Sequence, residues 1–220
     1  MNSKGIDKIL SVLFLVVGSP FILIILTLDF IFTLQFPLIV QTRAVSLNSK
    51  KIKIVKIRTI IDSKDFRIDQ KKSKGILYHE SYRRHVPAFC VWLRKSGLDE
   101  ILQLINVIKG EMSLIGPRPL LLDELKLMKE KNSYLYYSRE ELNSIPGITG
   151  YWQVFGDREK GIENLVEWDE YYERNKSFLL NFRIMLKTIS VVFFAAHSDS
   201  IIRNKKAGKH SKNIETGEAM

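Results

Sequence analysis

The chain has 220 residues, enough for one domain with a real hydrophobic core but cramped for two. Its 34 lysines and arginines outnumber its 24 aspartates and glutamates, and the net charge of +10 suits a polyanionic partner: a nucleic acid, an anionic membrane surface or a phosphorylated substrate. The single cysteine, Cys90, excludes an internal disulfide framework, and its apolar neighbours favour a buried thiol over a reactive one.

A long apolar run without charges occupies residues 9–28. Twenty residues in a helix cover about 30 Å, the thickness of a bilayer core. No small-residue cleavage site follows, and the apolar character continues beyond the run. The pattern therefore predicts a membrane segment rather than a removable signal peptide.

Gly18, Ser19 and Pro20 interrupt the middle of this run. Proline removes a backbone hydrogen bond, so we expect a bend there, with the Ser19 hydroxyl donating to a freed carbonyl. Basic residues flank both ends, and positive charge marks the cytoplasmic side of a membrane. We therefore predict that residues 1–42 form a kinked re-entrant helix and its connection; an ordinary kinked spanning helix fits almost equally well.

The remaining chain predicts a small cytoplasmic catalytic domain over residues 43–202, so that the fold class is α+β and predominantly helical. Residues 51–60 alternate basic and apolar side chains, which indicates a half-buried strand with Lys56 and Arg58 on one face. Residues 62–74 are charged and predict an exposed loop. Residues 179–196 are apolar on more than one face, typical of an interfacial or a core helix. Residues 203–220 predict a basic, disordered tail.

A helical apolar period over residues 98–108 follows Ser96 and contains Asp99 and Glu100. Ser96 and Asp99 have the spacing of a capping box, and Gly110 is expected to end the helix. In the first turn the helix dipole favours negative charge, which keeps Asp99 ionised and able to act as a nucleophile. Taken alone, such a pair is more often a simple helix cap.

Two further motifs raise the odds of a functional site. In residues 116–119 two prolines fix the backbone around Arg118, and a rigidly held guanidinium suits bidentate phosphate recognition. In residues 146–154 glycines flank Thr149, which permits close approach of a ligand, and Gln153 follows an aromatic pair. A turn leading into an aromatic core strand explains this second motif as well.

In combination and order, these segments resemble the bacterial sugar transferases, monotopic phosphoglycosyl transferases that begin the assembly of capsule, exopolysaccharide and lipopolysaccharide glycans. The resemblance covers residues 8–188: the apolar run with its Ser-Pro break, KIRTI, LRKSGLDEILQL, MSLIGPRPLL, PGITGYWQV and WDEYY with LLNFRIMLKT. Each piece alone is unspecific, whereas their combination is highly specific.

The resemblance implies a two-step reaction at the cytoplasmic face of the bacterial inner membrane. Asp99 attacks the sugar-linked phosphorus of a UDP-sugar and expels UMP, and undecaprenyl phosphate then takes the phospho-sugar from Asp99. Glu100 assists, and Asp99 and Glu100 are candidate ligands of Mg²⁺. The expected phosphate-binding residues are Arg118, Arg94, Lys56 and Arg58, and the expected nucleotide-sugar-binding residues are Gln153 and Thr149. Membrane lipid and downstream glycosyltransferases are the other expected partners.

Three alternatives stay open at this point. A membrane phosphohydrolase could use the same carboxylates and release the phosphate group to water. A basic membrane protein could bind anionic lipid or nucleic acid, but its lysines and arginines are spread over loops without interleaved aromatic residues, so we expect no nucleic acid. A relative without activity could act as a scaffold. The sequence does not identify the sugar.

Overall fold

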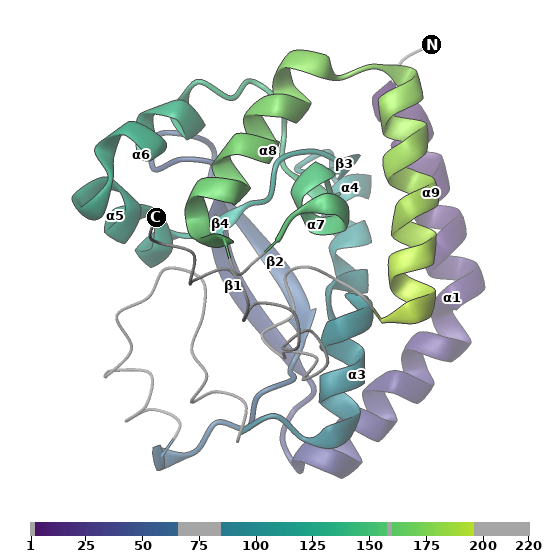
Figure 1. Ribbon diagram of the computed structural model, residues 1–220. Coiled ribbons are helices and arrows are strands. Elements are labelled where there is room, and N and C mark those ends of the chain that lie inside the picture. The colour runs from purple at the N-terminus through teal and green to yellow at the C-terminus, as the bar shows by residue number, and fades with distance from the viewer. Residues whose placement is uncertain (1–2, 66–84, 158–159, 196–220) are drawn as a thin grey trace, which may run out of the picture.

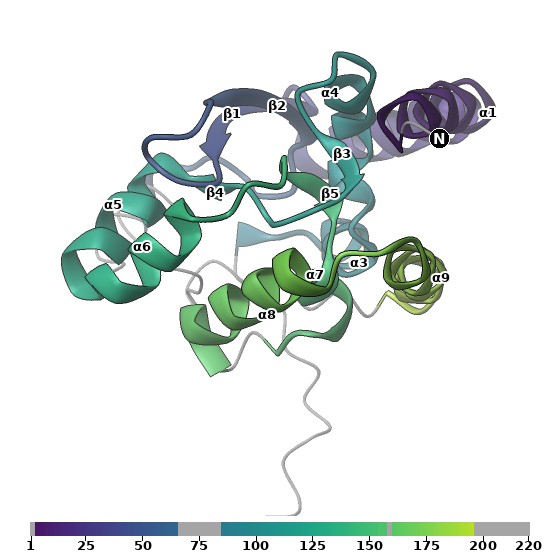
Figure 2. The same ribbon diagram turned by 90° about the horizontal axis from the view of Figure 1, so that it is seen from above.

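A computed structural model of the protein describes residues 3–65, 85–157 and 160–195. The predicted tail, residues 203–220, and most of the predicted exposed loop lie outside the described residues. Helices flank a small antiparallel sheet, and two long helices, α1 and α9, lie on the same side of the molecule in both views (Figures 1 and 2).

Helix α1 spans Ser3–Thr33 without interruption and contains Pro20. The Ser19 hydroxyl donates to the Val16 carbonyl at 2.8 Å. This is the carbonyl that loses its helical partner because residue 20 is a proline. The predicted compensation by Ser19 is therefore confirmed.

The face of α1 that packs on the protein is narrow. Within Gly5–Thr33 the most apolar window has a mean hydropathy of 2.9, yet only 17% of it is buried, and the helix is long and apolar enough to cross a membrane. A core helix of a soluble protein would bury most of such a surface. The buried positions follow a helical spacing and include three polar residues: Ser11, Ile22, Ile25, Asp29 and Thr33.

Strands β1 (Leu38–Ala44) and β2 (Ile52–Ile57) pair antiparallel, and β4 (Leu120–Leu121) adds to the other edge of β1. The predicted alternation in β2 is confirmed, although the strand is shorter than residues 51–60. Ile52, Ile54 and Lys56 lie on the buried face, whereas Lys53 is exposed. Lys56 is therefore brought into the interior by its register.

The segment before the predicted acidic helix differs from the expectation. Ser96 is the last residue of α3 (Ala88–Ser96), and its hydroxyl donates to the Leu93 carbonyl. Gly97, at φ 75°, ends α3 in the left-handed conformation that glycine tolerates. A 3₁₀ helix, η2 (Leu98–Gln103), then leads into α4 (Leu104–Ile108). The predicted capping box is wrong because Gly97 makes Ser96 the end of one helix rather than the start of the next.

The rest of the described core is helical. Two short parallel strands, β3 (Ser113–Ile115) and β5 (Gly147–Thr149), stand beside it. Trp152 and Tyr136 are fully buried in the largest apolar cluster. Helices α5 (Leu122–Lys131) and α6 (Ser133–Glu140) follow β4, and α7 (Tyr151–Phe155) and α8 (Gly161–Asn175) come next after β5. Because Trp152 belongs to α7, the aromatic core strand considered for residues 146–154 is wrong.

Helix α9 (Phe178–Phe194) carries an exposed apolar surface, as α1 does. Only Ile184 and Val191 are fully buried in it. The exposed positions recur at helical spacing and include Phe178, Phe182, Leu186, Ile189 and Phe193. Burial on one narrow stripe argues against the core-helix interpretation of this segment.

Candidate active site

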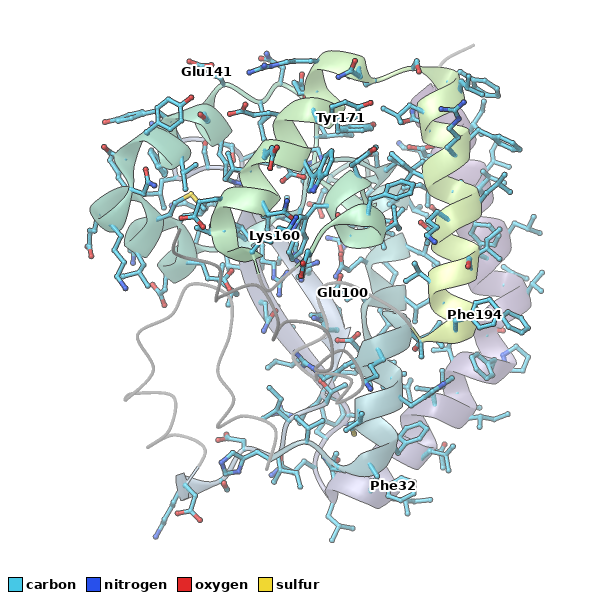
Figure 3. All side chains as sticks on the ribbon, in the orientation of Figure 1. Phe32, Glu100, Glu141, Lys160, Tyr171 and Phe194 are labelled. Atoms are coloured by element: carbon cyan, nitrogen blue, oxygen red, sulfur yellow. The ribbon has the colours of Figure 1, made fainter. Side chains whose placement is uncertain are left out.

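Two neighbouring carboxylates and one lysine form the centre of the site. The Lys56 Nζ lies 2.7 Å from a Glu100 oxygen and 3.2 Å from an Asp99 oxygen. β2 supplies the lysine and η2 supplies both acids, in its first turn. All three residues are buried, and Glu100 lies towards the middle of the molecule (Figure 3). Desolvation strengthens each of these charge interactions.

Arg118 completes this cluster from the other side. Its Nη2 is 3.4 Å from the same Glu100 oxygen, and the side chain is almost fully buried. Burial alone would raise the pKa of Glu100, but Lys56, Arg118 and Arg43 together hold it well below its usual range. Glu100 is therefore ionised at neutral pH and is a weak base.

The loop that carries Arg118 is interlocked with the loop before α7. The Gly116 amide donates to Thr149 and the Gly147 amide donates to Pro117, both at 3.0 Å. A Cβ on Gly147 would lie 2.7 Å from the Gly116 Cα, and one on Gly150 would collide with the Gly116 carbonyl oxygen. These glycines permit close approach of two loops. The expectation that they make room for a ligand is thus replaced by a structural role.

A buried ion pair forms hydrogen bonds with the backbone of Arg118. The Arg139 Nη1 lies 2.7 Å from an Asp169 oxygen, and both side chains are almost completely buried. The same Asp169 oxygen accepts from the Arg118 amide at 3.3 Å, and the Arg139 Nη2 donates to the Arg118 carbonyl at 2.6 Å. Burial raises the pKa of Asp169 to about 6, against the attraction of Arg139 and Arg118.

Sequence reasoning missed Arg139 and Asp169, and also Arg43. Arg43 is buried near the end of β1, donates to the Pro119 carbonyl at 3.2 Å and adds positive charge at Glu100. One signal was available for it, because a lone arginine in the otherwise uncharged strand Leu38–Ala44 needs an internal partner. Nothing local marks Arg139, which stands beside Glu140 at the end of α6.

The remaining predicted phosphate-binding residues make other contacts. The Arg58 Nε donates to the Phe36 carbonyl at 2.9 Å, next to the end of α1. The Arg94 Nη1 donates to the Thr59 hydroxyl at 2.7 Å. Lys56 and Arg118 thus contact the carboxylates, whereas Arg58 and Arg94 hold connecting segments.

The two predicted nucleotide-sugar-binding residues flank the start of α7. The Thr149 and Thr188 hydroxyls are 2.8 Å apart, which ties β5 to α9. Gln153 is fully buried within α7. Both residues lie beside the loop of Arg118, and their roles toward a nucleotide sugar stay predictions.

Within the described ranges, no group of three or more histidine, cysteine or acidic side chains could hold a metal ion. The available donors are the Asp99 and Glu100 carboxylates. Magnesium sites in phosphate-handling enzymes commonly use one or two carboxylates and complete their ligands with water and substrate phosphates. The donor set therefore fits Mg²⁺ if substrate phosphates supply further oxygens.

The site places two fixed cations beside a candidate carboxylate nucleophile, and phosphoryl transfer relies on such fixed positive charge. The family model for bacterial sugar transferases matches residues 1–195. The chain therefore belongs to the bacterial sugar transferase family and is a transferase.

Individual relatives agree with this assignment. The chain is 30% identical to the exopolysaccharide production protein ExoY of Sinorhizobium fredii over 200 residues, which cover 87% of this chain and 85% of the relative. It is 39% identical over 101 residues to the undecaprenyl-phosphate galactose phosphotransferase of Salmonella typhimurium, covering 46% and 20% of the two chains. It is 30% identical over 191 residues to the UDP-glucose:undecaprenyl-phosphate glucose-1-phosphate transferase of Klebsiella pneumoniae, covering 83% and 38%.

Proposed function

We propose that this chain transfers a sugar 1-phosphate from a UDP-sugar to undecaprenyl phosphate, releasing UMP, as the first membrane step of a bacterial glycan pathway. The observation that carries the proposal is the buried Asp99–Glu100 pair held by Lys56 and Arg118. The names of the Salmonella and Klebsiella relatives support the lipid acceptor, and that of the Klebsiella relative supports the UDP-sugar donor.

In the first step, an Asp99 carboxylate oxygen attacks the phosphorus that is bonded to the sugar. A bond forms between that oxygen and phosphorus, and the phosphoanhydride bond breaks, so that UMP leaves with the bonding electron pair. The product is an aspartyl phospho-sugar, a mixed anhydride in which the phosphoryl group stays activated. In the second step, an oxygen of the lipid phosphate attacks the same phosphorus, and the Asp99 carboxylate leaves unchanged.

Lys56 and Arg118 make different contacts with the two acids. Lys56 contacts both carboxylates, so it holds Asp99 next to Glu100 and offsets their mutual repulsion. Arg118 contacts Glu100 with one nitrogen and brings a delocalised charge suited to phosphate oxygens. Because Glu100 has a low pKa, it acts as a fixed negative charge and positions its neighbours rather than removing a proton.

We include Mg²⁺ in the proposal, held by Asp99, Glu100 and substrate phosphates. Such an ion supplies charge neutralisation for the phosphate groups when bound. Glu100 stays negatively charged because Lys56, Arg118 and Arg43 hold its pKa well below its usual range. Asp99 must have one oxygen available for the attack on phosphorus.

The proposal places the protein at the cytoplasmic face of the inner membrane, with α1 re-entrant and α9 in the interface. The exposed apolar surfaces of α1 and α9 support membrane contact, and both helices lie on one side of the molecule (Figures 1 and 2). Pro20 and the changing direction of the α1 ribbon in Figure 1 support a bend. A surface-bound enzyme can receive a soluble nucleotide sugar and a lipid phosphate together.

Replacing Pro20 tests the re-entrant form. Pro20→Leu restores the missing backbone hydrogen bond, so we expect α1 to straighten and carry the amino terminus across the bilayer. A cysteine introduced as Ser3→Cys reports its side through an impermeant maleimide, because Cys90 is buried. Labelling from the cytoplasmic side in both proteins would refute the role of Pro20, and labelling from the far side in the parent would refute the re-entrant form.

A panel of UDP-sugars tests the reaction. UMP release is measured with undecaprenyl phosphate and Mg²⁺ for the wild type, Asp99→Asn and the control Asp123→Asn, whose side chain is 94% exposed. We expect repeated turnover with at least one sugar that depends on lipid, metal and Asp99 and is unchanged in the control; without lipid, UMP release should stop at about one equivalent per enzyme. Release of free sugar phosphate without lipid would instead establish a hydrolase.

A further inference from the structure

The buried Arg139–Asp169 pair lies outside the carboxylate cluster, and neither residue has a role in the reaction proposed above. Arg139 comes from α6 and is completely buried, while Asp169 comes from α8 and is 1% exposed. Removing two charges from water is costly, and apolar residues often fill such a position equally well or better. A buried ion pair of this kind therefore calls for an explanation other than stability.

The contacts of the pair converge on one residue. Asp169 accepts from the Arg118 amide at 3.3 Å, and Arg139 donates to the Arg118 carbonyl at 2.6 Å. Both backbone groups of Arg118 are thus held by side chains that are 30 residues apart in sequence. Arg139 also donates through Nε to the Val45 carbonyl at 3.1 Å, which fixes the plane of the guanidinium against the end of β1.

Arg118 is the residue for which such a hold matters most. It stands between Pro117 and Pro119, and neither proline has a backbone N–H that could donate a hydrogen bond to hold this segment. Its guanidinium reaches Glu100 at 3.4 Å, at the long end of a hydrogen bond, and a small movement of the backbone would break this contact. A preorganised guanidinium at Arg118 would stabilise developing charge on a phosphate group without a cost of reorganisation.

We propose that Arg139 and Asp169 are positioning residues, which hold the backbone of Arg118 so that its guanidinium is aimed at Glu100 and at the phosphate groups of the donor. The part of this inference that concerns the phosphate groups rests on the proposed function. The part that concerns the contact between Arg118 and Glu100 does not. The hydrogen bonds of the pair go to each other and to the backbone of Arg118 and Val45, so we expect the pair to act through Arg118.

Arg139→Lys is the main variant, because it keeps the buried positive charge next to Asp169 and so protects the fold. The planar guanidinium of Arg139 donates to Asp169, Arg118 and Val45 at once, and the single ammonium group of a lysine cannot reproduce all three hydrogen bonds. Asp169→Asn is the second variant; it keeps an acceptor for the Arg118 amide and removes the charge. The matched control is Arg174→Lys on α8, whose side chain is 76% exposed.

Two measurements test the inference. Hydrogen–deuterium exchange should rise at the Arg118 loop in Arg139→Lys, with little change in β2 and none in the control. A double-mutant cycle on UMP release adds the functional part. We expect Arg139→Lys to lower kcat/KM about 10- to 100-fold, Arg118→Ala about 100-fold or more, and the double variant no further than Arg118→Ala alone.

The outcomes separate this inference from the proposed function. Unchanged exchange at the loop of Arg118 in both variants overturns the positioning role, whatever the activity. Losses that multiply in the double variant also overturn it, because they show that Arg139 acts independently of Arg118. A wild type without UMP release contradicts the proposed function, while raised local exchange would still support the hold on Arg118.

Discussion

Replacing Lys56 by methionine removes one charge from the centre of the cluster and keeps the length of the side chain. Lys56 is the shared partner of Asp99 and Glu100, at 3.2 and 2.7 Å. Without it, two buried carboxylates face each other, with Arg118 at 3.4 Å as the remaining contact of Glu100 among these four residues. Removing one partner of a buried ion pair costs about 3–5 kcal/mol, and we expect the lower end because Arg118 stays.

The expected change in melting temperature follows from this energy. For a chain of this size, 1 kcal/mol corresponds to about 2–4 °C, so a loss of about 3 kcal/mol lowers the melting temperature by about 6–12 °C at neutral pH. Circular dichroism on the protein in detergent micelles measures it. Lys53→Met is the matched control, because Lys53 lies in the same strand but is exposed.

The loss of stability in Lys56→Met should also depend on pH. In the wild type, the pKa of Glu100 is held well below its usual range, so its contribution to stability is full above about pH 4.5 and is lost only in stronger acid. In Lys56→Met, burial is opposed by fewer charges and the pKa of Glu100 rises. The difference in melting temperature between the wild type and Lys56→Met should then become smaller as the pH falls from 7 toward 5. Equal losses in Lys53→Met and Lys56→Met, or a gap that widens in acid, would refute this reasoning.

Two further predictions concern packing. Gly147→Ala should lower the free energy of unfolding by about 1–3 kcal/mol or more, because its Cβ would lie 2.7 Å from the Gly116 Cα. The control Gly5→Ala has open space around it and should not lower this free energy. Equal melting temperatures for the two variants would contradict the interlocked loops. Cys90 should resist maleimide at pH 8 until the protein unfolds, because it is fully buried and burial raises its pKa to about 12; rapid labelling of the native protein would contradict its placement.

Parts of the site could be predicted because their signals are local. The period-two alternation of β2 determines the face of Lys56, and Asp99 and Glu100 stand in the first turn of a helix as expected, although the turn is a 3₁₀ helix. Where Ser96 was expected to begin this helix, Gly97 ends the previous one. A left-handed glycine and a serine cap are both common at such a junction, and tertiary packing decides between them.

Other parts depend on contacts that no local pattern reveals. Asp169 reaches the Arg118 amide across 51 positions of sequence, and its partner group belongs to the backbone, which has no sequence signature. The glycines at positions 147 and 150 predict close approach to a ligand because close approach to another loop requires the same missing Cβ. The five residues of α7 are too few to distinguish a helix from a strand by period.

In the proposed reaction, Asp99 carries the phospho-sugar between the donor and the lipid. The most direct measurement is the intact mass of the purified protein after incubation with the UDP-sugar that it uses, in the presence of Mg²⁺ and without the lipid acceptor. We expect a mass gain of one sugar phosphate, located on the peptide that contains Asp99, lost on addition of undecaprenyl phosphate and absent in Asp99→Asn. Lipid-linked product formed by Asp99→Asn at the wild-type rate would contradict it.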